Sequence, residues 1–269
     1  NILKINNKIG DFLHMDKTKP KIAFSFLIAI FLAAFEGVVV STAAPVIVKS
    51  LHNFKMISWI FSIFLLTSAI STPIYGKLAD LYGRKRIFMI GISIFLFGSL
   101  LAGLSQTMHQ LIIFRGIQGI GAGAIFTIGF TMIGDIFTLE ERSIIQGAIS
   151  TIWGIAGLVG PLLGGFLIDY LSWQWIFFIN IPFGLLSVYI LAKFVHEQKP
   201  ATNPKIDYLG AILLSIAIGS LLYGVMSLDE DFYLGVILLV ITLISSILFY
   251  IQEARTSEPI VPLFILNKS

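Results

Sequence analysis

Long apolar runs separated by short polar segments are the dominant pattern along the chain. Eight of these runs reach the length of about 20 residues that an α-helix needs to cross a bilayer. The runs are continuous rather than alternating, which favours helices over the strands of a membrane barrel. They lie at residues 22–40, 57–76, 87–104, 111–136, 144–171, 175–194, 209–228 and 232–251. The pattern therefore predicts an all-α membrane protein.

The composition supports a membrane location and narrows the class of protein. Hydrophobic residues make up 57% of the chain and charged residues only 12%, against about 45–50% and about 25% in soluble domains. The absence of cysteine excludes a disulfide framework and a thiolate metal site. The 4 histidines fall in predicted tails and loops, and no nucleophile, metal-binding or phosphate-loop motif is present. We therefore expect no enzymatic activity, cofactor or metal, and a lipid bilayer rather than a nucleic acid as the partner.

The positive charges predict how the chain is oriented. Nearly all of the 18 lysine and arginine residues fall on one side of the predicted spans. The opposite side has only Lys49 and Lys55, together with the acidic run 229–231, while Arg115 lies inside the fourth span. Because cytoplasmic loops are enriched in lysine and arginine, the basic side is predicted to be cytoplasmic. The chain is then expected to lie in the cell membrane, with both of its ends in the cytoplasm.

The same pattern divides the chain into five regions. We expect a basic cytoplasmic N-terminal tail, a six-span bundle, a cytoplasmic linker with two prolines, two further spans, and a cytoplasmic lead-in to a segment beyond the sequence. Their predicted boundaries are 1–21, 22–195, 196–206, 207–252 and 253–269. The N-terminal region is either a disordered tail or a short amphipathic helix on the inner leaflet.

Glu36 stands out among the acidic residues because it lies deep within the first predicted span. An ionisable group at the centre of a bilayer is costly and usually faces a cavity or a partner. Removal from water favours the neutral form of a carboxyl group, whereas a nearby cation favours the ionised form. Glu36 is therefore predicted to exchange a proton for a cationic ligand. The alternative is a neutral glutamic acid that hydrogen-bonds a neighbouring helix.

Arg115 is the second charge inside a predicted span, and it begins a glycine-rich segment at 115–123. A guanidinium keeps its charge and must find carbonyls, a carboxylate or water. We expect Arg115 to tune a proton-carrying carboxyl or to restrain a gate, and the small residues after it to let another backbone approach closely. The alternative is an arginine whose side chain extends to the outer interface.

Two further segments carry unusual patterns. The loop between the second and third spans contains Gly76, Asp80, Gly83 and Arg84, in which Asp80 can pair with Arg84 and Gly83 permits a tight turn. The fifth span carries a proline among closely spaced glycines, which predicts a bent, smooth face suited to sliding against another helix. These residues are Gly154, Gly157, Gly160, Pro161, Gly164 and Gly165. The alternatives are simple anchoring by the loop charges and static close packing by the glycines.

Together these segments resemble the major facilitator superfamily of secondary transporters. The loop at 76–86 is similar to the family signature between spans two and three, with Leu81 where many members have arginine. Residues 115–123 resemble the fourth-span signature, and residues 157–165 resemble the fifth-span signature of antiporters. Further segments resemble the fourteen-span drug:proton antiporters, with Glu36 at a position usually held by aspartate. They are 35–45, 173–184 and 207–210.

The resemblance implies a fold of two six-helix bundles around a site at the middle of the membrane. The first six predicted spans match the N-terminal six-helix bundle. Spans seven and eight match the two further transmembrane helices that the fourteen-span branch inserts between the bundles. Residues 258–267 resemble the lead-in to the second bundle, which is absent from this sequence. We therefore expect the N-terminal portion of a longer transporter.

The resemblance also implies proton-coupled export of amphipathic or cationic drugs by alternating access. Glu36 would couple proton and substrate, and Arg115 would support proton handling and gating. The loop residues would stabilise one end state, and the fifth-span glycines would form a bending, sealing helix. An aromatic substrate pocket is predicted from Trp59, Phe61, Phe126, Phe130 and Trp153, and the alternative is that these side chains face lipid or fill the core. The alternatives are a proton-coupled exporter of one metabolite or peptide, and a truncated membrane protein that does not transport.

Overall fold

The computed structural model describes residues 18–196, 207–228, 231–256 and 260, and these residues form helices joined by short turns. Eight helical segments are long and apolar enough to cross a membrane, which confirms the predicted all-α membrane fold and the number of spans. The sixth span consists of the short helix α7 followed by α8. The elements are α2 (Lys19–Leu51), η1 (Phe54–Met56), α3 (Ile57–Tyr82), α4 (Arg84–Gly103), α5 (Met108–Ile136), α6 (Leu139–Tyr170), α7 (Trp175–Phe178), α8 (Asn180–Phe194), α9 (Tyr208–Ser227) and α10 (Phe232–Arg255).

The first helix is much longer than the apolar run that predicted it. It was expected to end at residue 40, but α2 continues through Pro45 to Leu51. The polar residues after residue 40 do not end the helix, because Ser41 bonds the carbonyl of Val38 at 2.6 Å and so satisfies its own hydroxyl. In the same way α6 remains one helix through Pro161, so the bend predicted there is not a break.

The predicted regions outside the bundle are described only in part. The first helix begins at Lys19, inside the expected tail 1–21, and residues 1–17 lie outside the described residues. Most of the expected linker 196–206 also lies outside them. The eighth span continues to Arg255, past its predicted end at residue 251.

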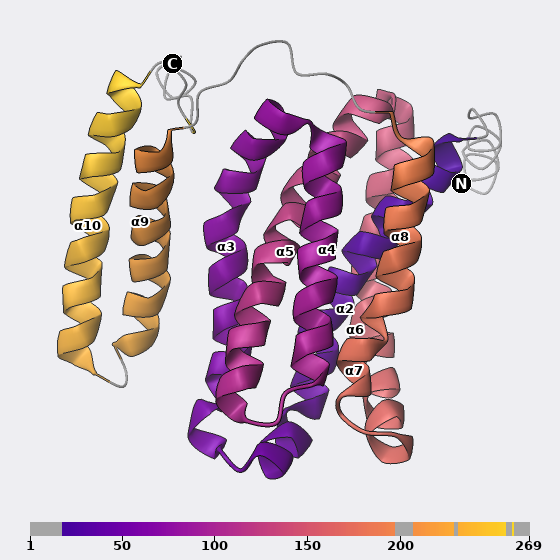
Figure 1. The fold of residues 1–269 in the computed structure, drawn as a ribbon, viewed down its shortest axis with the longest axis horizontal. Coiled ribbons are helices and arrows are strands. Elements are labelled where there is room, and N and C mark those ends of the chain that lie inside the picture. The colour runs from indigo at the N-terminus through magenta and orange to yellow at the C-terminus, as the bar shows by residue number, and fades with distance from the viewer. Residues whose placement is uncertain (1–17, 197–206, 229–230, 257–259, 261–269) are drawn as a thin grey trace, which may run out of the picture.

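Six spans form one bundle, and the last two form a hairpin beside it (Figure 1). Within the bundle α4 and α3 pack on α5, while α6 and α8 pack on α2. The hairpin of α9 and α10 stands next to α3, on the side of the bundle away from α8 (Figure 1). The rings of Trp59 and Tyr223 join α3 to α9, with centroids 5.3 Å apart.

Glycines allow the bundle helices to approach one another closely. A Cβ added at Gly98 of α4 would lie 2.5 Å from the backbone nitrogen of Gln118. A Cβ at Gly121 of α5 would meet the backbone of Phe95, and one at Gly119 would meet the backbone of Phe64 in α3. The glycine-rich segment that begins at Arg115 therefore brings α5 into backbone contact with two neighbours, as the sequence predicted.

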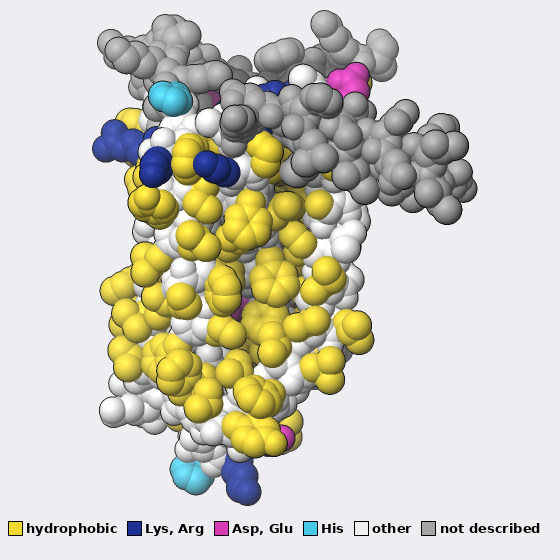
Figure 2. All heavy atoms as spheres, turned by 90° about the vertical axis from the view of Figure 1, so that its right-hand side faces the viewer, with side chains coloured by type: hydrophobic (Ala, Val, Ile, Leu, Met, Phe, Trp, Pro, Cys, Tyr) yellow, Lys and Arg dark blue, Asp and Glu magenta, His cyan; other side chains and the backbone are white. Residues whose placement is uncertain are grey.

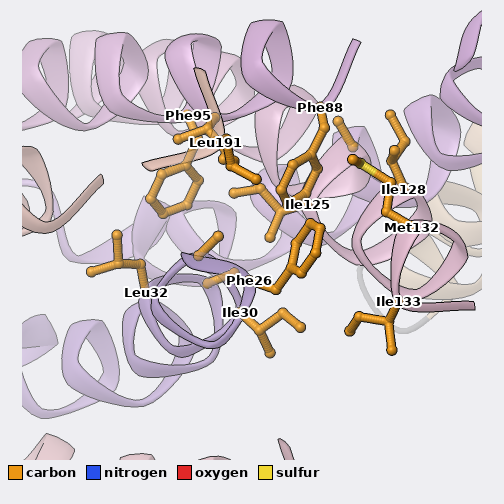
Figure 3. Close-up of a cluster of buried hydrophobic side chains, with 14 of the residues drawn as sticks. Phe26, Ile30, Leu32, Phe88, Phe95, Ile125, Ile128, Met132, Ile133 and Leu191 are labelled. Carbon is orange, nitrogen blue, oxygen red and sulfur yellow. The ribbon is translucent and has the colours of Figure 1, made fainter. Parts of the chain in front are cut away.

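Apolar side chains fill the bundle in two clusters that meet near the middle of α2. One cluster packs α2 against α4, α5 and α8, and Figure 3 shows its aromatic and branched side chains, including Phe26, Phe88 and Ile125. The other cluster lies toward the far end of α2, around Val39 and Ile47. Glu36 falls between the two clusters, so it is held inside an apolar interior on both sides.

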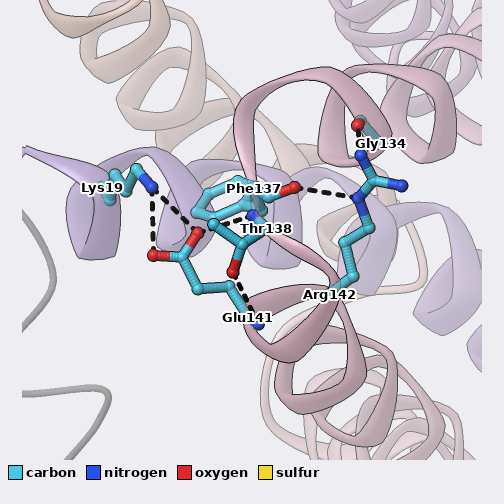
Figure 4. A network of polar contacts seen from close by, with 6 residues as sticks. All are labelled: Lys19, Gly134, Phe137, Thr138, Glu141 and Arg142. Carbon is cyan, nitrogen blue, oxygen red and sulfur yellow. Dashed lines mark hydrogen bonds and ion pairs between the residues drawn. The ribbon is translucent and has the colours of Figure 1, made fainter.

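The end of the bundle nearest the start of α2 is tied together by charged side chains. Thr138 and Glu141 form a capping box at the start of α6, and Lys19 bonds both carboxylate oxygens of Glu141 at 3.0 and 2.9 Å (Figure 4). Arg142 donates to the carbonyls of Phe137 and Gly134 at the end of α5 (Figure 4). Figure 2 shows lysine and arginine side chains gathered at this end, above a broad hydrophobic band that suits a bilayer.

Candidate functional site

Glu36 and Arg115, the two charges predicted inside the membrane, form an ion pair. Arg115 Nη1 lies 2.7 Å from Glu36 Oε1, and the side chains are 0% and 1% exposed for Glu36 and Arg115 respectively. Glu36 lies at the middle of α2, whereas Arg115 lies two turns into α5. The pair therefore joins two helices at the centre of the bundle, and the alternative of an arginine reaching the outer interface is wrong.

Arg115 also has acceptors that carry no charge. Its Nε donates to the carbonyl oxygen of Ile60 in α3 at 3.2 Å, and Nη1 donates to Gln118 Oε1 at 2.9 Å. The guanidinium carbon lies 4.3 Å from the centroid of the Phe64 ring, close enough for a cation–π interaction. These contacts hold the guanidinium whether or not Glu36 carries a charge.

Asn180 is the third member of this centre, and the sequence analysis did not single it out. Its Nδ2 donates to Glu36 Oε2 at 2.5 Å and to Ser99 Oγ at 2.9 Å. The Ser99 hydroxyl in turn donates to the carbonyl of Phe177 at 2.8 Å. The available signal was an amide at the first position of α8, inside the apolar segment 173–184. The contact with Glu36 brings α2, α4 and α8 to one point.

The buried pair favours a functional role over a purely stabilising one. Taking two charges out of water is costly, and their attraction compensates only when the remaining polar atoms also have partners. Here Arg115 covers one carboxylate oxygen of Glu36 and Asn180 covers the other. Because apolar residues of similar volume often stabilise a core as well as an ion pair does, stability alone gives no reason for these charges.

A second polar cluster joins the end of α3, the start of α4 and the end of α5. Arg84 Nη2 lies 3.2 Å from Asp80 Oδ1, so the predicted pair does form, and Nη1 of Arg84 also bonds Asp135 at the end of α5. Gly83 adopts φ 97°, a conformation that favours glycine, and this allows the tight turn from α3 into α4. The sequence analysis missed Asp135. Gly76 faces the side chain of Thr127 at 3.8 Å, an ordinary contact distance.

The glycines of α6 fall on two faces of the helix. Gly160 and Gly164 are buried against α2, where an added Cβ would lie 2.8 Å from Val38 Cγ1 and 3.0 Å from Val39 Cγ2 respectively. Gly154, Gly157 and Gly165 have no described atom near an added Cβ, and Pro161 is exposed. One set therefore packs the bundle, and the other forms an open face of α6.

The five aromatic residues of the predicted pocket are divided between two levels of the bundle. Phe126 and Trp153 stack with centroids 6.1 Å apart, and Phe130 is 45% exposed one turn further along α5. Trp59 instead packs on Tyr223 of α9, and Phe61 packs on the apolar cluster around Val39.

The two levels lie far apart along the helix axes. Because α3 and α5 run side by side in the same direction, their contacts show which residues of the two helices lie at the same height. Gly119 of α5 lies level with Phe64 of α3, so Trp59 and Phe126 are separated by roughly 20 Å along the helix axis at 1.5 Å per residue. The prediction of one pocket from all five aromatic residues is therefore wrong. Of the five, Phe126 and Trp153 are the pair whose rings stack on each other.

Comparison with known proteins gives the family of the chain. The family model described as Major Facilitator Superfamily matches residues 26–258. The chain is 37% identical over 263 residues to Multidrug resistance protein 3 of Bacillus subtilis (strain 168), covering 94% of this chain and 51% of that protein. It is 37% identical over 247 residues to the multidrug transporter protein MdtP of the same organism, covering 90% and 45%. It is 34% identical over 246 residues to the efflux pump dotC of Dothistroma septosporum (strain NZE10 / CBS 128990), covering 88% and 42%.

Solved structures share the fold at low sequence identity. A peptide transporter of the POT family superposes with a TM-score of 0.60 at 17% identity, covering 86% of this chain and 51% of that one. The human organic anion transporter MFSD10 gives a TM-score of 0.59 at 15% identity, covering 77% and 55%. The chain spans about half the length of the relatives that it matches. By its motifs, its helices and its relatives, the chain belongs to the major facilitator superfamily of membrane transporters.

Proposed function

We propose that the protein of which this chain is part exports amphipathic or cationic drugs in exchange for protons, by alternating access. The relatives named as multidrug transporters support the substrate class. The observation that carries the proton coupling is the buried ion pair between Glu36 and Arg115. Among the described residues, Glu36 is the acid with an exposed fraction of 0%. The chain lies in the cell membrane with both of its ends in the cytoplasm.

The contacts of Glu36 suit a residue that alternates between two protonation states. When Glu36 is ionised, Arg115 and Asn180 satisfy its two oxygens. When a proton neutralises Glu36, Arg115 keeps Ile60, Gln118 and the face of Phe64 as partners. The guanidinium therefore stays in place while the carboxyl gains or loses a proton. A cationic substrate that approaches Glu36 during the transport cycle favours release of that proton, which couples the two movements.

The aromatic pair of Phe126 and Trp153 is the part of the chain that we assign to substrate contact. The two rings come from α5 and α6, and Trp153 is 48% exposed, so its face is open to a ligand. Aromatic faces attract organic cations by roughly 0.5–2 kcal/mol. Such contacts depend little on the exact shape of the ligand, which suits a transporter with several substrates.

The polar cluster of Arg84 with Asp80 and Asp135 is proposed to hold one end state of the transport cycle. It ties the turn between α3 and α4 to the end of α5. The side chain of Asp80 is 61% exposed and that of Arg84 is 35% exposed, so each surface pair contributes only about 0–1 kcal/mol. Contacts of this strength can form and break during a cycle.

Efflux of a fluorescent cationic dye from cells that express the complete reading frame tests this function. We expect efflux that stops when a proton uncoupler is added. Glu36→Gln should abolish proton-driven efflux while the protein remains in the membrane, because the amide cannot exchange a proton. Glu140→Gln, which changes an exposed acid at the start of α6, is the matched control and should transport normally. Wild-type efflux by Glu36→Gln under an imposed pH gradient would refute the coupling role.

A further inference from the structure

The side-chain amide of Asn180 has a fixed orientation and one unused atom. Both hydrogens of Nδ2 are committed, one to Glu36 Oε2 at 2.5 Å and one to Ser99 Oγ at 2.9 Å. The Oδ1 atom is buried and has no hydrogen-bond partner among the described residues. Asn180 is 0% exposed, so bulk water does not reach this oxygen. The amide therefore contacts the Glu36 centre only through its nitrogen.

The neighbours explain why the nitrogen, and not the oxygen, faces Glu36. The hydroxyl of Ser99 donates to the Phe177 carbonyl at 2.8 Å and so presents a lone pair to Asn180. An ionised Glu36 presents lone pairs as well, because a carboxylate only accepts hydrogen bonds. Both neighbours thus require donors, and the amide nitrogen supplies two. The observed orientation is the one that matches an ionised Glu36.

A proton on Glu36 reverses this requirement. Because Arg115 Nη1 occupies Oε1 at 2.7 Å, the free position for the proton is Oε2, which then becomes a donor facing the donor of Asn180. A half-turn of the amide about its Cβ–Cγ bond places Oδ1 where Nδ2 was. The oxygen then accepts from the protonated Oε2 and from the hydroxyl of Ser99, which rotates away from Phe177. The amide of Asn180 makes two hydrogen bonds in each state, while the Phe177 carbonyl gives up its bond from Ser99 in the second.

We infer that Asn180 is a positioning residue that pairs with Glu36 in both of its protonation states, donating to the carboxylate and accepting from the acid after a half-turn of its amide. This inference rests on the proposed proton coupling by Glu36 and deepens it. The unused Oδ1 is the acceptor that the neutral state needs. A leucine of similar volume would fill the same space but serve neither state.

Asn180, Arg115 and Gln118 are the described side chains that act on the charge of Glu36. From α5 the charged group that faces the carboxyl is Arg115, and Gln118 of the same helix binds that arginine. From α8 the uncharged amide of Asn180 faces the carboxyl, and Ser99 of α4 orients that amide. The described contacts of α3, α6 and α7 bring no titratable side chain to the Glu36 carboxyl. A change at Asn180 is therefore read directly in the titration of Glu36.

The test is an infrared pH titration of the Glu36 carboxyl in purified protein from the complete reading frame. Its band is assigned as the one missing from Glu36→Gln. In Asn180→Leu the midpoint should rise by about one pH unit or more, because the bond that the ionised carboxylate loses is stronger than the one that the neutral acid loses. Ser99→Ala should shift it in the same direction by less, since the amide keeps Glu36 but loses its orientation. The control is Ser187→Ala, which lies on α8 like Asn180. It removes an equally buried hydrogen bond to the carbonyl of Ser25 and should leave the midpoint unchanged.

The outcomes separate this inference from the proposed function. An unchanged midpoint in both Asn180→Leu and Ser99→Ala overturns the inference, as does an equal shift in Ser187→Ala. If Asn180→Leu fails to reach the membrane, the midpoint of Ser99→Ala decides. The pH profile of dye efflux, measured on the same variants, should move with the carboxyl titration. A shifted titration beside efflux that does not depend on Glu36 supports the role of Asn180 and refutes the coupling role of Glu36.

Discussion

Burial decides which charged residues of this protein can carry a coupled reaction. Glu36 is 0% exposed, and both of its oxygens are bonded by side chains from other helices. Asp80 pairs with an arginine too, but its side chain is 61% exposed. Exposed pairs contribute about 0–1 kcal/mol, whereas breaking a buried pair costs about 3–5 kcal/mol. The two acids therefore have different roles, although both appear in motifs of the sequence.

At this scale we predict the effect of removing the buried cation. Arg115→Met should lower the free energy of unfolding by about 3–5 kcal/mol, because Glu36 is left buried without its counter-charge. The double variant Arg115→Met with Glu36→Gln should recover part of that loss. The measurement is thermal unfolding of the purified protein in detergent. Arg84→Met is the comparison and should cost less than about 2 kcal/mol, since each of its two surface pairs contributes about 0–1 kcal/mol. Equal losses at Arg84 and Arg115 would contradict the assignment.

At the scale of helices, glycine positions determine how closely neighbours approach. Gly98 of α4 faces the backbone of Gln118, which cannot move aside as a side chain can. Gly134 at the end of α5 has no described atom within 4 Å of an added Cβ. The same residue type is therefore required at one place and replaceable at another, and only the packing distinguishes the two.

This difference predicts opposite effects of one substitution. Gly98→Ala should destabilise the bundle by about 1–3 kcal/mol, because α4 and α5 must separate to admit the methyl group. Gly134→Ala should leave stability unchanged or raise it by up to about 1 kcal/mol through helix propensity. Unfolding temperatures of the two purified variants give the comparison. A Gly98→Ala protein as stable as Gly134→Ala would show that the helices are not in backbone contact.

The divided glycines of α6 lead to a second prediction about elements. Gly164→Leu should destabilise the bundle, because its side chain meets Val39 and Thr42 of α2. Gly157→Leu faces open space and should leave the stability of the bundle intact. If Gly157→Leu nevertheless blocks dye efflux, that face of α6 contacts another part of the protein during transport. Stability and efflux are measured on the same preparations, and equal stability losses would refute the division into two faces.

At the scale of the whole molecule, charge and hydrophobicity are arranged along one axis. A hydrophobic band covers the face of the bundle seen in Figure 2, and basic side chains gather at one end of it. The opposite end, where α2 is followed by η1, carries Lys49 and Lys55. The hairpin of α9 and α10 extends the same band beside α3, with most of its large apolar side chains exposed. This arrangement suits a bilayer crossed eight times.

The absence of cysteine from the sequence makes the orientation directly testable. A cysteine introduced at exposed Lys55 should react with a membrane-impermeant maleimide added to intact cells. A cysteine at exposed His196, at the basic end, should react only after the cells are permeabilised, because the positive end is proposed to lie in the cytoplasm. The unmodified protein is the control for background labelling. The reverse pattern would overturn the proposed topology.

The amino-acid sequence alone is enough to predict the membrane class, the eight spans, the family and the two intramembrane charges. These follow from the length of apolar runs and from residue types within motifs, which are local properties. The packing of the helices is needed to see that Glu36 meets Arg115, that Asn180 joins them, and that Trp59 lies far from Phe126. The reason is geometric: each residue along a helix turns the side chain by about 100°, so partners depend on how each helix is rotated and shifted against its neighbours. Close contacts at glycines set those rotations and shifts, and no single span encodes them.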